Sequence, residues 1–312
     1  MALKDAANAA LYRALGYRLT RESPEQRAAA IRQARQRAVA QHRRTVAAPR
    51  QAKQATAAAG RDRAPGQATK RARRGNLPRH YDEVKREIIA KVLPRTMTGL
   101  PKLDPLVEAV RYVVKHQIPG DIVECGVWRG GSIEAMALTL LSLGETTREL
   151  HLFDTFEGMP APTEEDIRRR KGGDTITAAE ALANSDKSSK VWAIAGLDDV
   201  REAMTESGYP EDKIVYHQGM VEDTVPDQAP EQIAILRLDT DWYASTKHEL
   251  ETLWDRLSPG GVLMIDDYGD WEGARKATEE WLESIGAVLF LVPMGSGRIL
   301  VKPLTPSVHA GA

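Results

Sequence analysis

The sequence has little of what membrane, disulfide-rich and zinc-binding proteins usually contain. Its 312 residues include a single cysteine and no apolar run that approaches the ~20 residues of a membrane span. That cysteine, Cys125, excludes an internal disulfide framework, and its place in an apolar run predicts a small buried core residue. The seven histidines form no metal-ligand spacing, and the N-terminus lacks the long apolar stretch of a secretory signal. We therefore expect a cytoplasmic protein that does not bind membranes.

The net charge of −1 conceals two segments of opposite charge. Residues 1–80 contain 19 Lys/Arg and 4 Asp/Glu, a net charge of +15, whereas the rest of the chain has a net charge of −16. The basic segment is rich in alanine and arginine and poor in large apolar side chains, so it can bury little surface. We predict a basic extension over residues 1–79, partly helical or disordered, and one folded domain over residues 80–312.

The most informative stretch is a strand–helix–strand pattern late in this domain. The apolar runs Ile233–Leu238 and Gly261–Ile265 have the length and branching of buried parallel strands. A helix between them fits a capping box at Thr246 and Glu249 and is predicted to stop at the turn-forming residues 258–261. Such a unit produces neighbouring parallel strands joined by a right-handed crossover. Their carboxyl ends then share the edge of the sheet where α/β proteins bind ligands.

Acidic residues follow both of these strands. Asp239 and Asp241 come after the first, and Asp266 and Asp267 come after the second. Asp239 and the Asp266–Asp267 pair should meet at the shared edge of the sheet. Three carboxylates that converge on one place repel each other, so either some are protonated or a cation lies among them. Carboxylate oxygens suit Mg²⁺, Mn²⁺ or Ca²⁺ rather than zinc. Acids after strands also serve as helix caps and turn formers, and that alternative stays open.

A glycine-rich turn follows the first strand of the domain, within Asp121–Ile133. An acid–x–glycine pair, Glu124 and Gly126, is followed by two more glycines and then by a helix that starts at Ser132. The pattern is neither the dinucleotide-binding G-x-G-x-x-G nor a P-loop, which requires Gly-Lys-Ser/Thr. Its E-x-G-x-x-x-G-G-S form resembles the first motif of class I S-adenosylmethionine-dependent methyltransferases.

Two further strands place residues beside this turn. Leu150–Asp154 ends in an acid that is placed to bind ribose hydroxyls, with a helix cap as the alternative. The residues after it, 155–174, are rich in proline, glycine and charge, which predicts a loop that covers a site. A later strand turns at Gly219, and His217 within it is predicted to be a packed strand residue rather than a ligand.

The remaining patterns complete an α/β fold. Helical periodicity over 81–92, 106–116 and 271–285 flanks the strands, and the apolar runs 287–293 and 298–301 predict a closing antiparallel hairpin. We therefore predict a mostly parallel sheet with a C-terminal antiparallel hairpin, flanked by helices and preceded by the basic extension. A terminal hairpin on a five-strand βα series resembles the Rossmann-like sheet of class I methyltransferases.

Four motifs occur in the order expected of a single family. They are LHLFDTFEGMP, EDTVP, DTDWYAST and PGGVLMIDDYGD, at residues 150–160, 222–226, 239–246 and 259–270. Together they resemble the macrocin O-methyltransferase family, metal-dependent enzymes that methylate sugar hydroxyls on tylosin- and mycinamicin-type macrolides and related antibiotics. The resemblance covers about residues 90–303 and does not extend to residues 1–75. It implies methyl transfer from S-adenosylmethionine to a hydroxyl, assisted by Mg²⁺ or Mn²⁺.

The same resemblance implies roles for individual residues. The family's metal-ligand pattern falls on Asp239, Asp266 and Asp267, and its proposed base falls on Asp241, so that Asp239 and Asp241 are the predicted catalytic residues. Thr240 stands between them, where family members often carry glycine. The residues predicted to bind the cofactor are Glu124, Gly126, Ser132, Asp154, Thr155, Gly219 and Met220.

Two other functions are compatible with these residues. A metal-dependent hydrolase or phosphatase would use the same acids, although it would not need the glycine-rich motif or Asp154. A non-catalytic interaction protein would use its basic arm, including Lys70–Arg74, to bind nucleic acid, but that run lacks interleaved aromatics. We favour the methyltransferase, with a small-molecule hydroxyl acceptor that the resemblance suggests is a sugar-bearing natural product. The sequence leaves open whether the chain forms a homo-oligomer.

Overall fold

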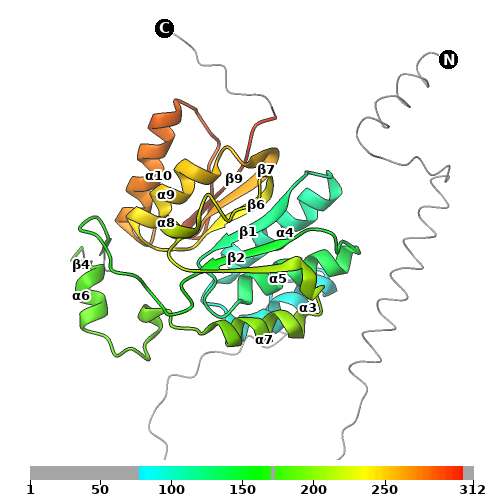
Figure 1. Cartoon of the computed structure of the whole chain (residues 1–312), viewed down its shortest axis with the longest axis horizontal. Helices are drawn as coiled ribbons and strands as arrows, with labels where there is room; N and C mark the ends of the chain where they lie inside the picture. The colour runs from blue at the N-terminus through cyan, green and yellow to red at the C-terminus, as the bar shows by residue number, and fades with distance from the viewer. Residues whose placement is uncertain (1–76, 170–172, 305–312) are drawn as a thin grey trace, which may run out of the picture. The chain divides into compact units, whose positions relative to one another are not determined.

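The computed structural model describes residues 77–169 and 173–304 (Figure 1). The predicted basic extension lies outside the described residues except at 77–79, so its predicted boundary stays a prediction. Within the described ranges, no helix combines the length and the apolar character needed to cross a membrane.

The described strands form one large sheet and one small one. Their bounds are β1 Asp121–Cys125, β2 Leu150–Asp154, β3 Ile167–Arg169, β4 Thr175–Thr177, β5 Ile214–Gln218, β6 Ile233–Leu238, β7 Leu257–Ile265, β8 Val292–Met294 and β9 Gly297–Val301. The large sheet has the order β5-β2-β1-β6-β7-β9-β8, and β3 pairs only with β4. The first five strands in this order are parallel, whereas β9 runs antiparallel to β7 and β8. The predicted mostly parallel sheet with a C-terminal antiparallel hairpin is thus confirmed.

Helices cover both faces of the large sheet (Figure 1). One layer contains α3 Glu83–Val92, α4 Leu100–Lys115, α5 Gly131–Leu143 and α7 Leu197–Ser207. The other contains α8 Val221–Thr224, α9 Tyr243–Leu253 and α10 Glu272–Ile285. The segment after β4 forms α6 Ala178–Ala183. Short 3₁₀ helices are η2 Leu93–Arg95, η3 Lys190–Trp192 and η4 Glu211–Lys213.

Burial on both faces explains the apolar character of the central strands. All six residues of β6 are buried, because helices pack against each side of it. Cys125 is a buried free thiol in the layer facing α9 and α10, as predicted. His217 is also buried and stacks on Phe153 with ring centroids 4.0 Å apart, which confirms a packed strand residue.

Three predicted local features are wrong or incomplete: the start of the helix between β6 and β7, the turn after it, and the length of the first hairpin strand. The helix between β6 and β7 begins at Tyr243 rather than at Thr246, and the predicted capping-box pair lies inside it. Its first turn is instead satisfied by a distant side chain, because Asp166 Oδ1 accepts the Tyr243 N–H at 2.7 Å. Residues 258–261 were predicted to form the turn between this helix and the next strand. They lie within β7 instead.

The predicted turn at residues 258–261 is a bulge in β7, and the first strand of the closing hairpin is shorter than predicted. Pairing between β6 and β7 jumps from Ile233↔Leu257 to Ile235↔Val262, so the proline and glycines form a bulge in a continuous strand. The first strand of the closing hairpin is only Val292–Met294 rather than 287–293. Val288 and Phe290 of the predicted run are exposed. Side-chain apolarity alone therefore overestimated the length of this edge strand.

Candidate active site

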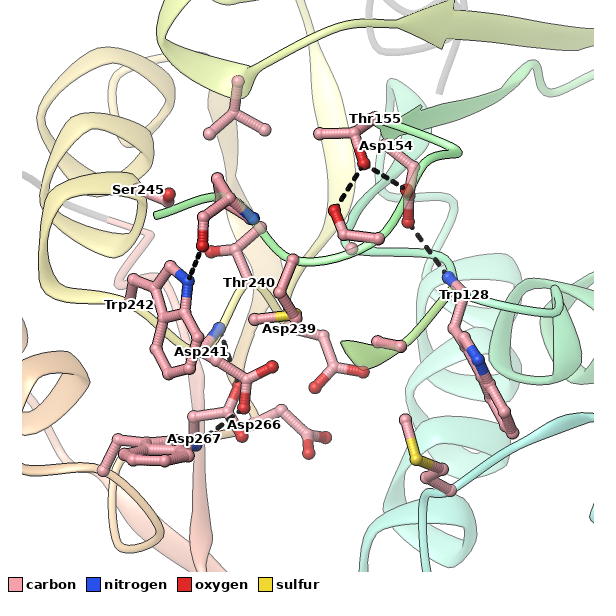
Figure 2. A pocket seen from close by; sticks show the side chains of 18 of the residues that line it. Trp128, Asp154, Thr155, Asp239, Thr240, Asp241, Trp242, Ser245, Asp266 and Asp267 are labelled. Carbon is pink, nitrogen blue, oxygen red and sulfur yellow. Dashed lines mark hydrogen bonds between the residues drawn. The ribbon is translucent and has the colours of Figure 1, made fainter. Parts of the chain in front are cut away.

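A cavity of about 360 Å³ lies at the carboxyl edge of the parallel strands (Figure 2). Residues at or just after the ends of β1, β2, β5, β6 and β7 line it, because parallel strands present their carboxyl ends to the same edge. Its wall includes most of the residues predicted from the sequence, namely Gly126, Asp154, Thr155, Gly219, Met220, Asp239, Asp241, Asp266 and Asp267.

Gly126 allows the turn after β1 to approach β6 closely. Its φ is +82°, and a Cβ added there would lie 2.1 Å from the carbonyl oxygen of Asp239. The adjacent backbone is tied across the strands, since the Asp239 N–H donates to the Cys125 carbonyl at 2.8 Å. Only glycine fits a positive φ beside another backbone at this distance. The glycine-rich turn and the acids after β6 therefore meet at one wall of the cavity.

Asp154 organises the loops at the other wall. Its Oδ2 accepts the Trp128 N–H at 3.0 Å (Figure 2) and the Val127 N–H at 2.7 Å, and its Oδ1 accepts the Phe156 N–H at 2.7 Å. Burial raises the pKa of Asp154, although these backbone hydrogen bonds oppose the shift. The neighbouring Gly219 N–H donates to the Asp154 carbonyl at 3.0 Å. This acid thus joins the turns after β1, β2 and β5.

Three predicted metal ligands converge at the opposite end of the cavity. Asp239, Asp266 and Asp267 each offer a carboxylate oxygen, and these oxygens lie within 4.8 Å of one another (Figure 2). They come from the ends of β6 and β7, the two strands whose adjacency the sequence predicted. The convergence inferred from the sequence is therefore present in the fold.

Two cations contact these acids in the described part of the chain, and neither was predicted. The guanidinium of Arg237, which is 1% exposed, lies 2.6 Å from Glu124, 2.8 Å from Asp239 and 2.7 Å from Asp266. Lys102 Nζ lies 2.5 Å from the second oxygen of Asp266. The signal for Arg237 was a charged residue inside an otherwise apolar, fully buried strand, since such a charge needs partners. Lys102 carried no such signal, because its partner is distant in sequence.

The cations affect the acids unequally. Desolvation raises the pKa values of Asp239 and Asp267 well above the ordinary range, and neighbouring carboxylates add to the shift. Burial would also raise the pKa of Asp266, but Arg237 and Lys102 outweigh it and lower that pKa. The five carboxylates of this group, Glu124 and Asp241 included, outnumber its two cations. An added positive charge would therefore be stabilised most strongly at Asp239 and Asp267.

Asp241 is held in an uncommon conformation beside this group. Its φ is +65°, its N–H donates to Asp267 Oδ2 at 3.3 Å, and Trp271 Nε1 donates to its Oδ1 at 2.8 Å. Desolvation, followed by the charge of Asp239, raises the pKa of Asp241 to about 7. A carboxyl group with this pKa can accept or release a proton near neutral pH.

The loop after β2 reaches the cavity, as predicted, although residues 167–169 of the predicted loop form β3 and residues 170–172 lie outside the described residues. The carbonyl of Pro160 accepts Trp242 Nε1 at 3.1 Å, and the buried Asp166 binds the start of α9. Trp242 and Trp271 meet edge to face with ring centroids 4.9 Å apart. The loop and two indole rings thus wall off the acidic end of the cavity.

Two predicted cofactor residues do not line the cavity, although both belong to the described chain. Glu124 is fully buried, and burial raises its pKa to about 7 even though Arg237 opposes the shift. The Ser132 hydroxyl lies 3.2 Å from that of Thr98, whose hydroxyl also accepts from Arg237. Both residues therefore connect to the cavity through Arg237. Their predicted contact with a cofactor stays a prediction.

Comparisons with known proteins agree with this arrangement. Residues 17–287 match the family model described as Macrocin-O-methyltransferase (TylF). The 8-demethyl-8-(2,3-dimethoxy-alpha-L-rhamnosyl)-tetracenomycin-C 4'-O-methyltransferase of Streptomyces olivaceus is 39% identical over 173 residues, which are 55% of this chain and 62% of the relative. The mycinamicin III 3''-O-methyltransferase of Micromonospora griseorubida is 30% identical over 174 residues, which are 55% of this chain and 65% of the relative. The chain thus matches less than two thirds of the length of these relatives.

A solved structure shares the fold. The O-methyltransferase NovP is 26% identical in sequence and superposes with a TM-score of 0.58, covering 67% of this chain and 82% of NovP. The calicheamicin methyltransferase CalS11 is 20% identical with a TM-score of 0.50 over 70% of this chain and 91% of that one. The fold of this chain is thus shared with solved methyltransferase structures.

Proposed function

Because the chain belongs to the macrocin-O-methyltransferase family, we propose that it transfers a methyl group from S-adenosylmethionine to a hydroxyl of a sugar-bearing small molecule. The observation that carries the proposal is the shared cavity. Its one end is built by the glycine-rich turn and Asp154, and its other end by the acids after β6 and β7. A donor bound at the first end would face an acceptor held at the second.

The donor end is proposed to bind S-adenosylmethionine through backbone and one acid. Gly126 leaves room for a ligand close to the chain, and Asp154 and Thr155 would contact the ribose. Gly219 and Met220 lie on the same wall and would border the adenine. Glu124 and Ser132 would act from behind the wall, by holding Arg237 and Thr98 in place. This is a positioning role rather than direct contact.

The acidic end fits a divalent cation, Mg²⁺ or Mn²⁺. Asp239 and Asp267 would hold it, with Asp266 as the third ligand, because these oxygens already converge and lack full charge compensation. Asp266 is bound by two cationic side chains and would contribute least. When bound, S-adenosylmethionine supplies an electrophilic methyl group, and the cation lowers the pKa of the acceptor hydroxyl and fixes its direction.

The chain itself would move the proton. Methyl transfer to oxygen forms the C–O bond as the C–S bond breaks, and the hydroxyl proton must leave. Asp241 is proposed to take it, because its pKa of about 7 lies near the operating pH. The hydrogen bond from Trp271 Nε1 to its Oδ1 holds the side chain in place. Trp242 and the loop after β2 exclude water from this step.

The acceptor is proposed to be a glycoside with neighbouring hydroxyls. The named relatives are O-methyltransferases of a rhamnosyl tetracenomycin and of mycinamicin III. The acidic end carries two indole rings together with Arg168 and Asp270, a mixture suited to the apolar faces and hydroxyl edges of a sugar. Which sugar and which hydroxyl are methylated would follow from the assay below.

The test is a methyl-transfer assay with S-adenosylmethionine against a panel of rhamnosides and deoxysugar glycosides. Product should form with Mg²⁺, disappear with EDTA and return when Mg²⁺ is added again. Asp267→Asn should lose this metal-dependent turnover, whereas Asp227→Asn, a change at an exposed acid outside the cavity, should keep it. Full activity of Asp239→Asn and Asp267→Asn in the presence of EDTA would rule out the metal assignment, and transfer to none of the glycosides would rule out the acceptor class.

A further inference from the structure

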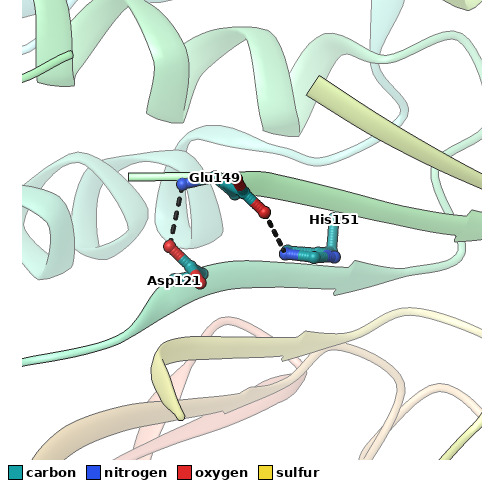
Figure 3. Close-up of side chains that lie close together, drawn as sticks. All are labelled: Asp121, Glu149 and His151. Carbon is teal, nitrogen blue, oxygen red and sulfur yellow. Dashed lines mark hydrogen bonds and ion pairs between the residues drawn. The ribbon is translucent and has the colours of Figure 1, made fainter. Parts of the chain in front are cut away.

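A second group of ligand-type side chains lies at the opposite edge of the sheet (Figure 3). Asp121 begins β1, Glu149 immediately precedes β2, and His151 is the second residue of β2. One ligand atom from each lies within 4.8 Å of the others. Since β1 and β2 are parallel, these residues occupy the amino ends of the strands, away from the cavity described above.

A chain of hydrogen bonds sets the protonation of the His151 ring. The amide oxygen of Gln228 lies 3.1 Å from His217 Nδ1, an arrangement that assigns the proton to this nitrogen. His217 Nε2 then accepts from His151 Nδ1, which lies 3.1 Å away. His151 Nδ1 is therefore protonated, and its Nε2 carries a lone pair.

That lone pair is aimed at a carboxylate. His151 is 6% exposed, and its Nε2 has no hydrogen-bond partner among the described residues. The nearest acidic atom is Glu149 Oε2, at 3.5 Å, and a carboxylate oxygen cannot donate. A cation between the buried imidazole nitrogen and the carboxylate oxygen would satisfy both lone pairs.

We propose that Asp121, Glu149 and His151 form a Zn²⁺ site. Zinc–ligand bonds of about 2.1 Å in a tetrahedron place neighbouring ligand atoms roughly 3.4 Å apart, and His151 Nε2 and Glu149 Oε2 are 3.5 Å apart. An imidazole nitrogen favours Zn²⁺ over Mg²⁺, which prefers oxygen ligands. A ligand histidine that donates its other N–H to a partner is the usual arrangement around zinc. His217 is that partner here.

The surroundings leave room for the ion. Lys213 Nζ lies 3.2 Å from Glu149 Oε1, so it occupies one carboxylate oxygen and leaves Oε2 for the metal. Asp121 Oδ1 accepts the Glu149 N–H at 2.8 Å, which fixes both acids relative to each other (Figure 3). Asp121 and Glu149 are partly exposed, so solvent can reach a fourth position. The ion would link the starts of β1 and β2 and stabilise this edge of the sheet.

The experiment measures zinc retained by the full chain. Protein is incubated with Zn²⁺ and excess Mg²⁺, passed over a desalting column, and analysed for metal content. Mg²⁺ competes at the acidic end of the cavity, so one Zn²⁺ per chain should remain at the new site. Glu149→Gln and His151→Gln should lose it, whereas Asp267→Asn and the exposed-site control Glu211→Gln should retain it. Added zinc should also raise the melting temperature of the parent chain but not of Glu149→Gln.

A second measurement keeps the proposal testable if His151→Gln does not fold. In the zinc-free chain, long-range ¹H–¹⁵N spectra should show His151 protonated at Nδ1 and bare at Nε2, and zinc should shift the Nε2 resonance. A protonated Nε2 would mean that the relay runs in the other direction and would overturn the site. Zinc that stays in Glu149→Gln but leaves Asp267→Asn would place the ion in the cavity instead and would also overturn it.

Discussion

Arg237 is the residue on which the acidic end of the cavity depends. It is the last residue but one of β6, where its neighbours in the strand are aliphatic, and its guanidinium joins Glu124, Asp239 and Asp266. A buried arginine requires such partners, because an unpaired charge in the interior is very costly. The strand could be predicted from the apolar run, but the direction in which Arg237 points could not. Its contacts come from three different strands.

Asp241→Asn tests the proposed base. The amide keeps the size of the side chain and its contact with Trp271 but cannot take a proton, so turnover should fall by about 10²–10⁴-fold. The KM for S-adenosylmethionine should stay unchanged, because Asp241 lies at the acceptor end. The matched control is Asp255→Asn, outside the cavity. Steady-state kinetics measure turnover and both KM values. If only the KM for S-adenosylmethionine rose and turnover stayed unchanged, Asp241 would not be the base.

Gly126→Ala tests the close approach of β1 and β6. Its Cβ would meet the Asp239 carbonyl at 2.1 Å, whereas a Cβ at Gly144, also at positive φ, would meet nothing within 4 Å. Gly144→Ala should cost about 1 kcal/mol for the left-handed backbone alone. Gly126→Ala should cost about 3 kcal/mol or more, because backbone must move. Urea unfolding measures both, and equal losses would show that the contact relaxes at little cost.

At the scale of elements, a loop residue supplies the cap at the start of α9. The start of α9 looked like a capping box in the sequence, but the structure satisfies the Tyr243 N–H through Asp166, 77 residues earlier. The loop that contains Asp166 thereby becomes part of the cavity wall. A local pattern cannot reveal a cap supplied from so far along the chain, because the two segments meet only when the sheet is assembled.

Glu134→Gln tests the interface between α3 and α5. Glu134 is 1% exposed, and burial raises its pKa even though Lys91 lies 3.1 Å away and opposes the shift. Since the folded pKa lies above the ordinary value of 4.5, the ionised carboxylate costs stability above that pH, and the cost disappears as the pH falls below it. The variant should be more stable at neutral pH by about 1 kcal/mol. Denaturation at several pH values measures this.

The control for this change is Glu83→Gln, at an exposed position of the first turn of α3, which should alter stability by less than about 0.5 kcal/mol. The gain in Glu134→Gln should shrink toward zero as the pH approaches 4.5. A gain that is the same at acidic and neutral pH would show that packing, rather than charge, accounts for it.

At the scale of the whole molecule, the parallel sheet separates two edges with different chemistry. The carboxyl edge holds the cavity with its hard oxygen ligands, and the amino edge holds the mixed oxygen and nitrogen group of Asp121, Glu149 and His151. The separation follows from strand direction, since every parallel strand presents its start to one edge and its end to the other. Metal selectivity between the edges is thus expected to follow ligand type.

Binding of the donor should stabilise the whole domain. S-adenosylmethionine at 100 times its Kd should add about 2.7 kcal/mol, which for a domain of this size is roughly a 5–10 °C rise in Tm. Asp267→Asn should keep this rise, because that residue lies at the acceptor end, whereas ATP should give none. Differential scanning fluorimetry measures it. A chain stabilised by phosphate esters and not by S-adenosylmethionine would favour the hydrolase alternative.

The sequence by itself determined the succession along the chain of the strands that form the large sheet, the adjacency of β6 and β7, and hence the meeting of Asp239 with Asp266 and Asp267. It could do so because the apolar periodicity and a right-handed crossover leave few ways to arrange such a unit. It did not reveal β3 and β4. Only the tertiary structure decided which cations enter the group, how Asp241 is oriented, and that Asp121, His151 and the His217 relay come together. Those contacts join residues far apart in sequence, and side-chain direction within a buried strand depends on what packs against it.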